Sequence, residues 1–473
     1  MSGSPNSAVL WTGSEIAAAT GGTLHGGDFD AFGVAFDSRE VEAHEVGGDL
    51  FIAMRGEQSD GHDYLAKAFA NGASGAVVER TTDALEGHPY VIVADSMAAL
   101  EALGHAARAR ARDATIIGVT GSAGKTGTKE ALFHALGRAA RGSVHRSVKS
   151  YNNHTGVPLS LARMPRDTRY GIFEMGMNHP RELAALTQFV RPHIAIVTTV
   201  APAHQEFFAS VEAIADAKAE IFEGLEDGGV AIVPFDNPHG ARLTAAASHH
   251  AASVVSFGTR AGADVRACEW VDVPEGGSLI TAKLPDGELC FTISAPGDHW
   301  VANAMAVLAA VEAAGADLGA AGLALAELPG LAGRGARHVV PVGEGEALLI
   351  DESYNANPAS MAATLAQLGR EPATRRIAVL GAMKELGNES AAYHAAIADP
   401  LLAAAVDIAV LVGDEMTPLA KRLEDSCAIA HLPDGDAALA WLSDNLAAGD
   451  AVLIKGSNAV GLGKVVATLT RGS

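Results

Sequence analysis

The chain has 473 residues, enough for about three domains of ~150 residues that each bury their own core. Its formal charge of -22 excludes a broad nucleic-acid or acidic-membrane surface, because phosphate groups are bound through an excess of lysine and arginine. No apolar run approaches the roughly 18 residues of a membrane span, and the N-terminal MSGSPNSAVL lacks the basic and apolar segments of a secretory signal.

The three cysteines, Cys268, Cys290 and Cys427, are scattered without the spacing of metal ligands. An odd number of cysteines in a large chain is typical of reduced thiols in a cytosol, and small core residues are the simplest interpretation of all three. We therefore expect a monomeric, cytoplasmic, multidomain enzyme that binds no nucleic acid and has no membrane span.

Residues 1–103 mix short strand-like runs with helical stretches, which predicts a small α/β domain followed by a linker near Gly104. The expected strands and helices lie at 50–54, 75–78 and 90–93, and at 64–71 and 97–110.

Residues 104–328 alternate more regularly, which predicts a second domain with a parallel sheet and helices between its strands. The expected strands lie at 115–119, 170–175, 194–199 and 230–234. Segment 264–294 differs, because its polar and apolar residues alternate and Pro285-Asp286-Gly287 is a turn signal. This segment predicts an antiparallel extension with a hairpin.

A glycine-rich turn, TGSAGKT at 120–126, lies between the strand at 115–119 and a helical stretch at 129–136. Such a turn cradles phosphate with backbone N–H groups, while a lysine bridges the β- and γ-phosphates and a threonine hydroxyl holds Mg²⁺. The strict pattern requires a glycine where Val119 stands, and Gly118 comes one place too early, so an ordinary strand-to-helix turn is the alternative. The predicted ATP contacts in this loop are Gly121, Ser122, Ala123, Gly124, Lys125, Thr126 and Gly127.

Two candidate metal ligands follow the ends of predicted strands, where open α/β proteins bind ligands. Glu174 ends the strand at 170–175 and can share Mg²⁺ with Thr126, although a helix N-cap or a surface carboxylate is the alternative. His204 lies just beyond the strand at 194–199 and can reach the same pocket, although a lone histidine is more often structural.

Two candidates lie on predicted helices. Lys218 falls inside the helical stretch 211–224, where a lysine is usually a solvated surface residue. Asn303, in GDHWVANAMAV, lies on a helix whose apolar face looks inward, so its amide needs a partner.

Residues 329–473, after a linker at Pro329-Gly330, repeat strand and helix patterns and predict a second doubly wound domain. The expected strands lie at 348–351, 377–381, 408–413 and 452–455. Asp351 ends the first of these strands and suits either a ribose hydroxyl or a helix cap. Arg334, in LAGRGAR, suits either a phosphate or a surface linker.

Taken in order, these pieces resemble the Mur ligase family over nearly the whole chain. The family's phosphate loop also has its first glycine displaced, which accounts for Gly118. The stretches that carry the resemblance are TGSAGKT (120–126), YNNHTGVPLSL (151–161), EMGMNHPRELAAL (174–186), AH and AKAEIF (203–222), GDHWVANA (297–304), GRGAR (333–337), DESYNANPASM (351–361) and KGS (455–457).

The resemblance implies an α/β protein of three domains: an N-terminal UDP-sugar domain at 1–103, a central ATPase domain at 104–328 and a C-terminal Rossmann-like domain at 329–473. The implied catalytic residues are Lys125, His204 and Lys218. The implied Mg²⁺ ligands are Thr126, Glu174, His204 and Lys218, since Lys218 matches the lysine that family members carbamylate with CO₂. Asn303, Arg334 and Asp351 match positions that hold adenine, phosphate and ribose. The implied substrate contacts are Ser38, Arg39, Asn152, Asn153, Asn355 and Asn357.

The C-terminal half separates the members of the family. The motif of the diamino-acid-adding enzyme, DNPR, is absent, whereas DESYNANPASM looks like the enzyme that adds a dipeptide. The implied substrates are ATP, UDP-N-acetylmuramoyl-tripeptide and D-alanyl-D-alanine, joined through an acyl phosphate. The alternatives are the diamino-acid ligase, a folate polyglutamylating enzyme and a non-catalytic P-loop regulatory protein. Two departures from the family are Gly127, where Thr or Ser is usual, and Ala382, where Asp is common.

Overall fold

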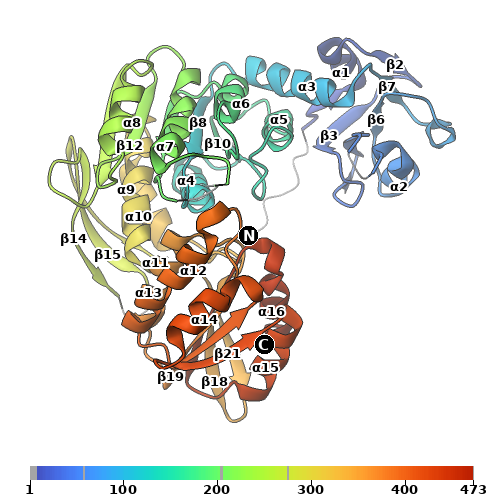
Figure 1. The fold of residues 1–473 in the computed structure, drawn as a ribbon. Coiled ribbons are helices and arrows are strands. Elements are labelled where there is room, and N and C mark those ends of the chain that lie inside the picture. The colour runs from blue at the N-terminus through green and yellow to red at the C-terminus, as the bar shows by residue number, and fades with distance from the viewer. Residues whose placement is uncertain (1–7, 57–58, 203–205, 274–275, 472–473) are drawn as a thin grey trace.

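The computed structural model describes residues 8–56, 59–202, 206–273 and 276–471, which form three α/β units, each built on its own sheet (Figure 1). This confirms the predicted fold class. No helix in these ranges is both long and apolar enough to cross a membrane. The domain boundaries at 103/104 and 328/329 stay predictions.

The N-terminal sheet has the order β1-β3-β5-β6-β7-β2, with β4 paired to β5. Strand β5 is an apolar run whose Leu50, Phe51 and Ile52 are fully buried, so it lies in the middle of the sheet. Its strands are β1 (Trp11–Thr12), β2 (Thr23–His25), β3 (Asp30–Ala35), β4 (Ala43–His44), β5 (Gly47–Ile52), β6 (Gly75–Val78) and β7 (Tyr90–Ile92). Its helices are α1 (Gly13–Thr20), α2 (Leu65–Ala70) and α3 (Ser96–Arg110).

The central sheet has nine strands in the order β16-β15-β14-β13-β12-β11-β8-β10-β9. The six strands from β13 to β9 are parallel, and β15 and β16 pair antiparallel, which confirms the predicted extension and its hairpin. The strands are β8 (Thr115–Thr120), β9 (Val144–Arg146), β10 (Tyr170–Glu174), β11 (Ile194–Val197), β12 (Val230–Pro234), β13 (Ser253–Gly258), β14 (Val265–Asp272), β15 (Ser278–Leu284) and β16 (Gly287–Ile293).

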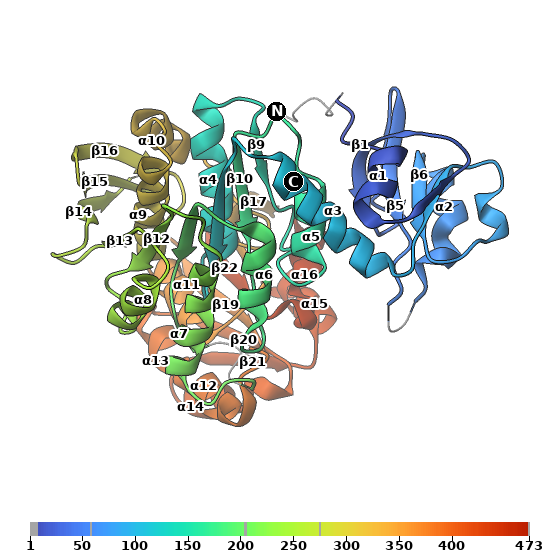
Figure 2. The same ribbon diagram turned by 90° about the horizontal axis from the view of Figure 1, so that it is seen from above.

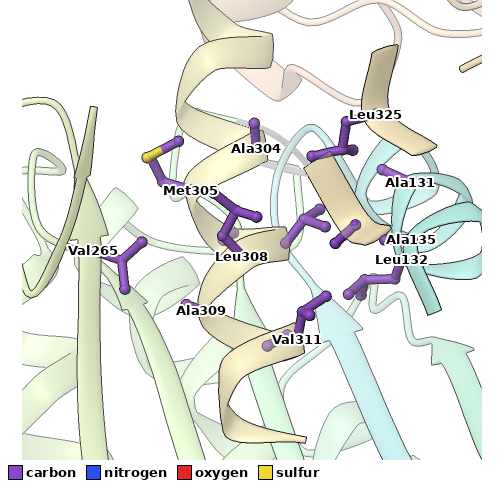
Figure 3. Packing of buried hydrophobic residues seen from close by; sticks show 14 of the residues in the cluster. Ala131, Leu132, Ala135, Val265, Ala304, Met305, Leu308, Ala309, Val311 and Leu325 are labelled. Atoms are coloured by element: carbon purple, nitrogen blue, oxygen red, sulfur yellow. The ribbon is translucent and has the colours of Figure 1, made fainter. Parts of the chain in front are cut away.

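Helix α9 is buried on nearly all sides in the central unit (Figure 3). It lies between the sheet, α4 and α10, and its Met305 and Leu308 are fully buried, which explains why the helix is apolar around most of its circumference. The helix predicted at 211–224 is α-helical only in α7 and continues as a 3₁₀ turn, Glu220–Gly224. The helices are α4 (Lys125–Ala139), α5 (Gly156–Ala162), α6 (Glu182–Val190), α7 (Val211–Ala219), α8 (Gly240–Ala247), α9 (Asp298–Ala313) and α10 (Leu318–Ala326).

The C-terminal sheet has the order β17-β18-β22-β19-β20-β21, parallel except for β17 at one edge. The sequence did not predict β17 or β21. The strands are β17 (Ala336–Val342), β18 (Gly345–Glu352), β19 (Arg375–Gly381), β20 (Ile408–Val412), β21 (Ala428–Leu432) and β22 (Asp450–Lys455). The helices are α11 (Pro358–Arg370), α12 (Ser390–Ala396), α13 (Ala398–Ala403), α14 (Thr417–Leu423), α15 (Gly435–Asn445) and α16 (Leu462–Leu469).

The two outer units are attached to the central one in different ways. Helix α3 runs unbroken from the N-terminal unit toward the central sheet, through the position where the sequence places a linker (Figure 2). It packs along α5, and the Trp11 indole N–H donates to the Ala162 carbonyl at 2.9 Å. The C-terminal unit follows an irregular segment, 327–335, that contains three glycines.

Candidate active site

The glycine-rich turn is shaped by two glycines with positive φ. Strand β8 lies between β10 and β11, and the chain leaves its C-terminal end through Gly121 (φ 153°) and Gly124 (φ 82°) before α4 begins at Lys125. A Cβ on Gly121 would lie 1.9 Å from Thr198 Oγ1, so only glycine fits there. The loop thus opens onto the N-terminus of a four-turn helix, which is an anion-binding arrangement.

Lys125 folds back over this loop. Its Nζ donates to the Gly121 carbonyl at 2.7 Å, and the side chain lines the cavity described below. Burial lowers the pKa of Lys125, and Arg334 lowers it further, whereas Glu174 opposes the shift. An anionic phosphate in the loop would offset this burial cost, because it supplies the charge that the ammonium lacks.

Glu174 is the centre of a buried polar cluster. The Thr126 hydroxyl donates to Oε2 of Glu174 at 2.8 Å, and the Asn152 amide donates to Oε1 at 2.8 Å. Lys129 Nζ lies 3.8 Å from Oε2, and Glu174 is only 1% exposed. The arrangement places a hydroxyl and a carboxylate, both hard oxygen donors, beside the phosphate loop.

A cavity of 610 Å³ lies between the central and C-terminal units. It gathers most of the residues that the sequence singled out for ATP, metal or substrate. The predicted residues that line it are Ser122, Ala123, Gly124, Lys125, Gly127, Asn152, Glu174, Lys218, Asn303, Arg334, Asn355 and Asn357.

Lys218 projects into this cavity from α7 and is only 2% exposed, so the solvated-surface interpretation is wrong. Burial, with the charge of Lys125 second, moves the pKa of Lys218 well below its ordinary value. The side chain therefore tends toward the neutral amine, the form that reacts as a nucleophile.

Two contacts join the C-terminal part of the chain to the central unit, and the second of them reaches the phosphate loop. The Arg334 guanidinium donates to Ser150 Oγ at 3.3 Å and lies 4.2 Å from the Tyr354 ring centre. The Asn357 amide donates to the Ser122 carbonyl at 3.4 Å while its oxygen caps α11. Arg334 therefore lines the cavity from the segment that leads into the C-terminal unit, and the surface-linker alternative does not describe its position.

Four of the predicted residues outside the N-terminal unit have structural partners and do not line the cavity: Gly121, whose carbonyl accepts from Lys125, and Thr126, Asn153 and Asp351. Asp351 accepts from the Gly333 backbone at 2.7 Å and from the Ser353 hydroxyl at 2.6 Å, and it fixes the turn that carries Arg334. Asn153 Oδ1 accepts from the Gly156 backbone at the start of α5. Thr126 reaches the site through Glu174.

The N-terminal candidates lie away from this cavity. Ser38 is buried, and its carbonyl accepts from the Asn71 amide at 2.7 Å. Arg39 is exposed and pairs with Asp37 at 2.6 Å, which lowers the pKa of that carboxyl to about 2. His204 lies outside the described residues.

Three residues escaped the sequence interpretation of the site. Lys129 is fully buried beside Glu174. The sequence feature that could have identified it is its spacing of one helical turn from Lys125. Lys455 is buried at the end of β22, where its Nζ lies 3.3 Å from Glu352, and its signal was a lysine after an apolar strand. Trp300 lines the cavity beside Gly127.

The fold and the cavity define a class of protein: an α/β protein with a glycine-rich phosphate-loop turn that opens into a cavity between its central and C-terminal units. Three family models match the chain: the "Mur ligase family, catalytic domain" over 31–130, the "Mur ligase middle domain" over 119–311 and the "Mur ligase, glutamate ligase domain" over 339–458. The chain belongs to the Mur ligase family and is a ligase.

Several relatives share one name, UDP-N-acetylmuramoyl-tripeptide--D-alanyl-D-alanine ligase. The Escherichia coli protein is 32% identical over 96% of this chain and 97% of its own, and that of Mycobacterium tuberculosis H37Rv is 35% identical over 92% and 91%. Among solved structures, MurF from Acinetobacter baumannii is 30% identical with a TM-score of 0.82, covering 97% of this chain and 98% of its own. MurF from Thermotoga maritima in complex with ADP is 27% identical with a TM-score of 0.74, covering 93% and 97%.

Proposed function

We propose that this ligase joins D-alanyl-D-alanine to UDP-N-acetylmuramoyl-tripeptide at the expense of ATP, in cytoplasmic peptidoglycan precursor synthesis. The observation that supports this proposal most directly is the position of the segment DESYNANP (351–358). Its Asn355 and Asn357 line the cavity beside the phosphate loop, and Asn357 donates to the Ser122 carbonyl of that loop. Relatives that carry the name of this activity match the chain over nearly its full length.

The chemistry must overcome a carboxylate that is a poor electrophile. An oxygen of the tripeptide carboxylate attacks the γ-phosphorus of ATP, ADP leaves, and an acyl phosphate forms. The neutral amine of the dipeptide then attacks the acyl carbon, and inorganic phosphate leaves. Lys125 stabilises the transferring charge from the loop, and Arg334 brings a second cation from the C-terminal unit.

The residues around Glu174 fit Mg²⁺, because Thr126 and Glu174 offer hard oxygen atoms next to the phosphate loop. The resemblance adds His204 as a ligand and a carbamylated Lys218, whose buried, low-pKa amine suits reaction with CO₂. When bound, Mg²⁺ would neutralise phosphate charge.

The remaining assignments follow the family resemblance. Ser38 and Arg39 hold the uridine end of the nucleotide substrate, and Asn152, Asn153, Asn355 and Asn357 are further substrate contacts. Asn303, Arg334 and Asp351 hold adenine, phosphate and ribose. The three domains divide near residues 103/104 and 328/329, and the enzyme acts as a monomer.

The test is to incubate the protein with ATP, Mg²⁺ and UDP-N-acetylmuramoyl-tripeptide and to measure phosphate release with each amine donor. Release that depends on D-alanyl-D-alanine supports the proposal. Release with a free diamino acid and UDP-N-acetylmuramoyl-dipeptide would assign the sister reaction, and no release with any donor would favour a regulatory protein.

A further inference from the structure

Gly127, the unexplained departure from the family, lies against an aromatic ring. It is the third residue of α4, directly after Thr126. A Cβ built on Gly127 would lie 2.8 Å from Cη2 and 3.2 Å from Cζ2 of Trp300. The backbone of Gly127 is ordinary helix, so glycine is needed here for space and not for conformation. A serine or threonine at this position could not coexist with the indole where it stands.

The indole stands between two cavities. A second cavity, of 300 Å³, adjoins the 610 Å³ cavity, and Gly127, Trp300, Arg334 and Glu352 line both of them. Trp300 is half-buried, packed on one side against the core cluster of the central unit. The rest of the ring therefore faces open space on the phosphate-loop side of the domain interface.

This position matches the path that a nucleotide would take from the loop. Phosphates bind at the backbone N–H groups of such a turn and of the first helical turn, and Gly127 is the third residue of that helix. A nucleoside on the Trp300 side of the loop would therefore lie beside Gly127. Asn303, predicted for adenine, lies one helical turn from Trp300 on α9 and lines the same cavity. An aromatic ring beside a base adds stacking energy, because every base has a flat π-face.

We propose that Trp300 forms an aromatic wall of the nucleobase subsite and that Gly127 is the residue that makes room for it. This inference rests on the ATP-dependent function and names a specificity-determining residue of the same site.

The first test compares ADP with inorganic tripolyphosphate, which lacks a base, by calorimetry in the presence of Mg²⁺. Trp300→Ala should weaken ADP binding about tenfold, within the range of base stacking, and leave tripolyphosphate binding unchanged. Trp300→Phe should keep most of the ADP affinity. Equal losses for both ligands, or no loss for ADP, would overturn the inference.

The second test uses intrinsic fluorescence, since the chain has four tryptophans. We expect ADP to change the emission of the wild type and of Trp270→Phe, whose ring lies in β14 of the antiparallel extension. The change should be absent in Trp300→Phe. A change that survives in Trp300→Phe would assign the signal to another tryptophan and contradict the stacking contact.

The pairing is tested by a double-mutant cycle. Gly127→Ser should weaken ADP binding severalfold by displacing the indole, and it should cause little further loss in a Trp300→Ala background. Additive losses would contradict the pairing. If the wild type itself binds no ADP, the ATP-dependent function fails; if it binds ADP and turns over while the Trp300 variants bind normally, only this inference fails.

Discussion

At the residue scale, the site brings together ionisable side chains that are buried even without a bound substrate. Lys125 and Lys218 both lie in the cavity, and burial lowers the pKa of each. Glu174 is the buried counter-charge, held by Thr126 and Asn152. Burying these groups without a ligand costs free energy. An anionic ligand bound with its cation offsets much of this cost, which suits ATP with Mg²⁺.

Lys125→Ala should abolish ADP formation, because the transferring phosphoryl group loses its cation. Binding of UDP-N-acetylmuramoyl-tripeptide should survive, since the N-terminal unit lies away from the loop. Coupled assay of ADP release and calorimetry of the nucleotide substrate check the two halves. Normal turnover by this variant would refute the role of the loop.

Lys218→Ala should lose most activity, and a short-chain carboxylic acid should restore part of it by occupying the place of the carbamate. The measurement is donor-dependent phosphate release with and without added acid. Lys421→Ala, a variant of a lysine in α14 of the C-terminal unit, is the control. Failure of any acid to rescue Lys218→Ala, with the variant folded, would count against carbamylation.

His145 makes stability depend on pH. Burial lowers its pKa from 6.5 to about 4, and its Nε2 lies 2.8 Å from the Ser160 carbonyl, which the neutral ring satisfies. Between pH 6.5 and 4 the unfolded chain binds the extra proton, so stability falls as the pH falls through this window, by up to about 3 kcal/mol. Urea unfolding at several pH values should show a flatter slope for His145→Asn, and an unchanged slope for the exposed His250→Asn.

At the element scale, long-range neighbours separate what the sequence could predict from what it could not. The apolar runs predicted as parallel strands are local patterns, and the sheets confirm them, whereas phosphate binding by the glycine-rich turn stays a prediction. The edge strand β17 was missed because it contains Pro341 and alternates buried with exposed residues, and β21 because most of it is half-exposed. Lys129 beside Glu174, and Trp300 beside Gly127, join segments far apart in the chain. The spacing of Lys129 from Lys125 indicates a shared helix face, but no local pattern identifies Glu174 as its partner or Trp300 as the neighbour of Gly127.

The turn after β8 tolerates no side chain at its first glycine. Gly121→Ala would place a methyl group 1.9 Å from Thr198 Oγ1, and this hydroxyl is held by the Ala123 carbonyl at 2.5 Å. The loop must distort, so ADP affinity should fall by more than tenfold. Gly137→Ala, on α4 with open space around it, is the matched control and should bind ADP normally. Calorimetry with ADP compares them, and normal binding by Gly121→Ala would contradict this geometry.

At the scale of the whole molecule, Glu40 ties the N-terminal unit to the central one. It accepts from Lys149 Nζ at 2.5 Å and from the Tyr151 hydroxyl at 2.9 Å, next to the predicted uridine contacts Ser38 and Arg39. With the proposed uridine contacts, a joint of this kind would set where the nucleotide end of the substrate lies relative to the loop.

Glu40→Gln should raise the KM for UDP-N-acetylmuramoyl-tripeptide severalfold, because the uridine end is held less accurately, while the Kd for ADP stays the same. Steady-state kinetics and calorimetry separate the two quantities. Glu45→Gln, an exposed residue of the same segment, is the control. An equal change in ADP affinity would show that Glu40 acts on the whole fold.

The unbroken helix α3 and the glycine-containing segment 327–335 make the two domain connections unequal. When the C-terminal unit is held in one orientation, the conformational entropy is lost mainly in segment 327–335. The proposed ATP contacts lie on both sides of that interface, and the incoming dipeptide is expected to lie between the same two units. Whichever binds first therefore supplies the ordering that the other would otherwise have to provide. The two should bind with positive thermodynamic coupling, whereas the UDP-nucleotide, held across the stiffer connection, should bind nearly independently of both.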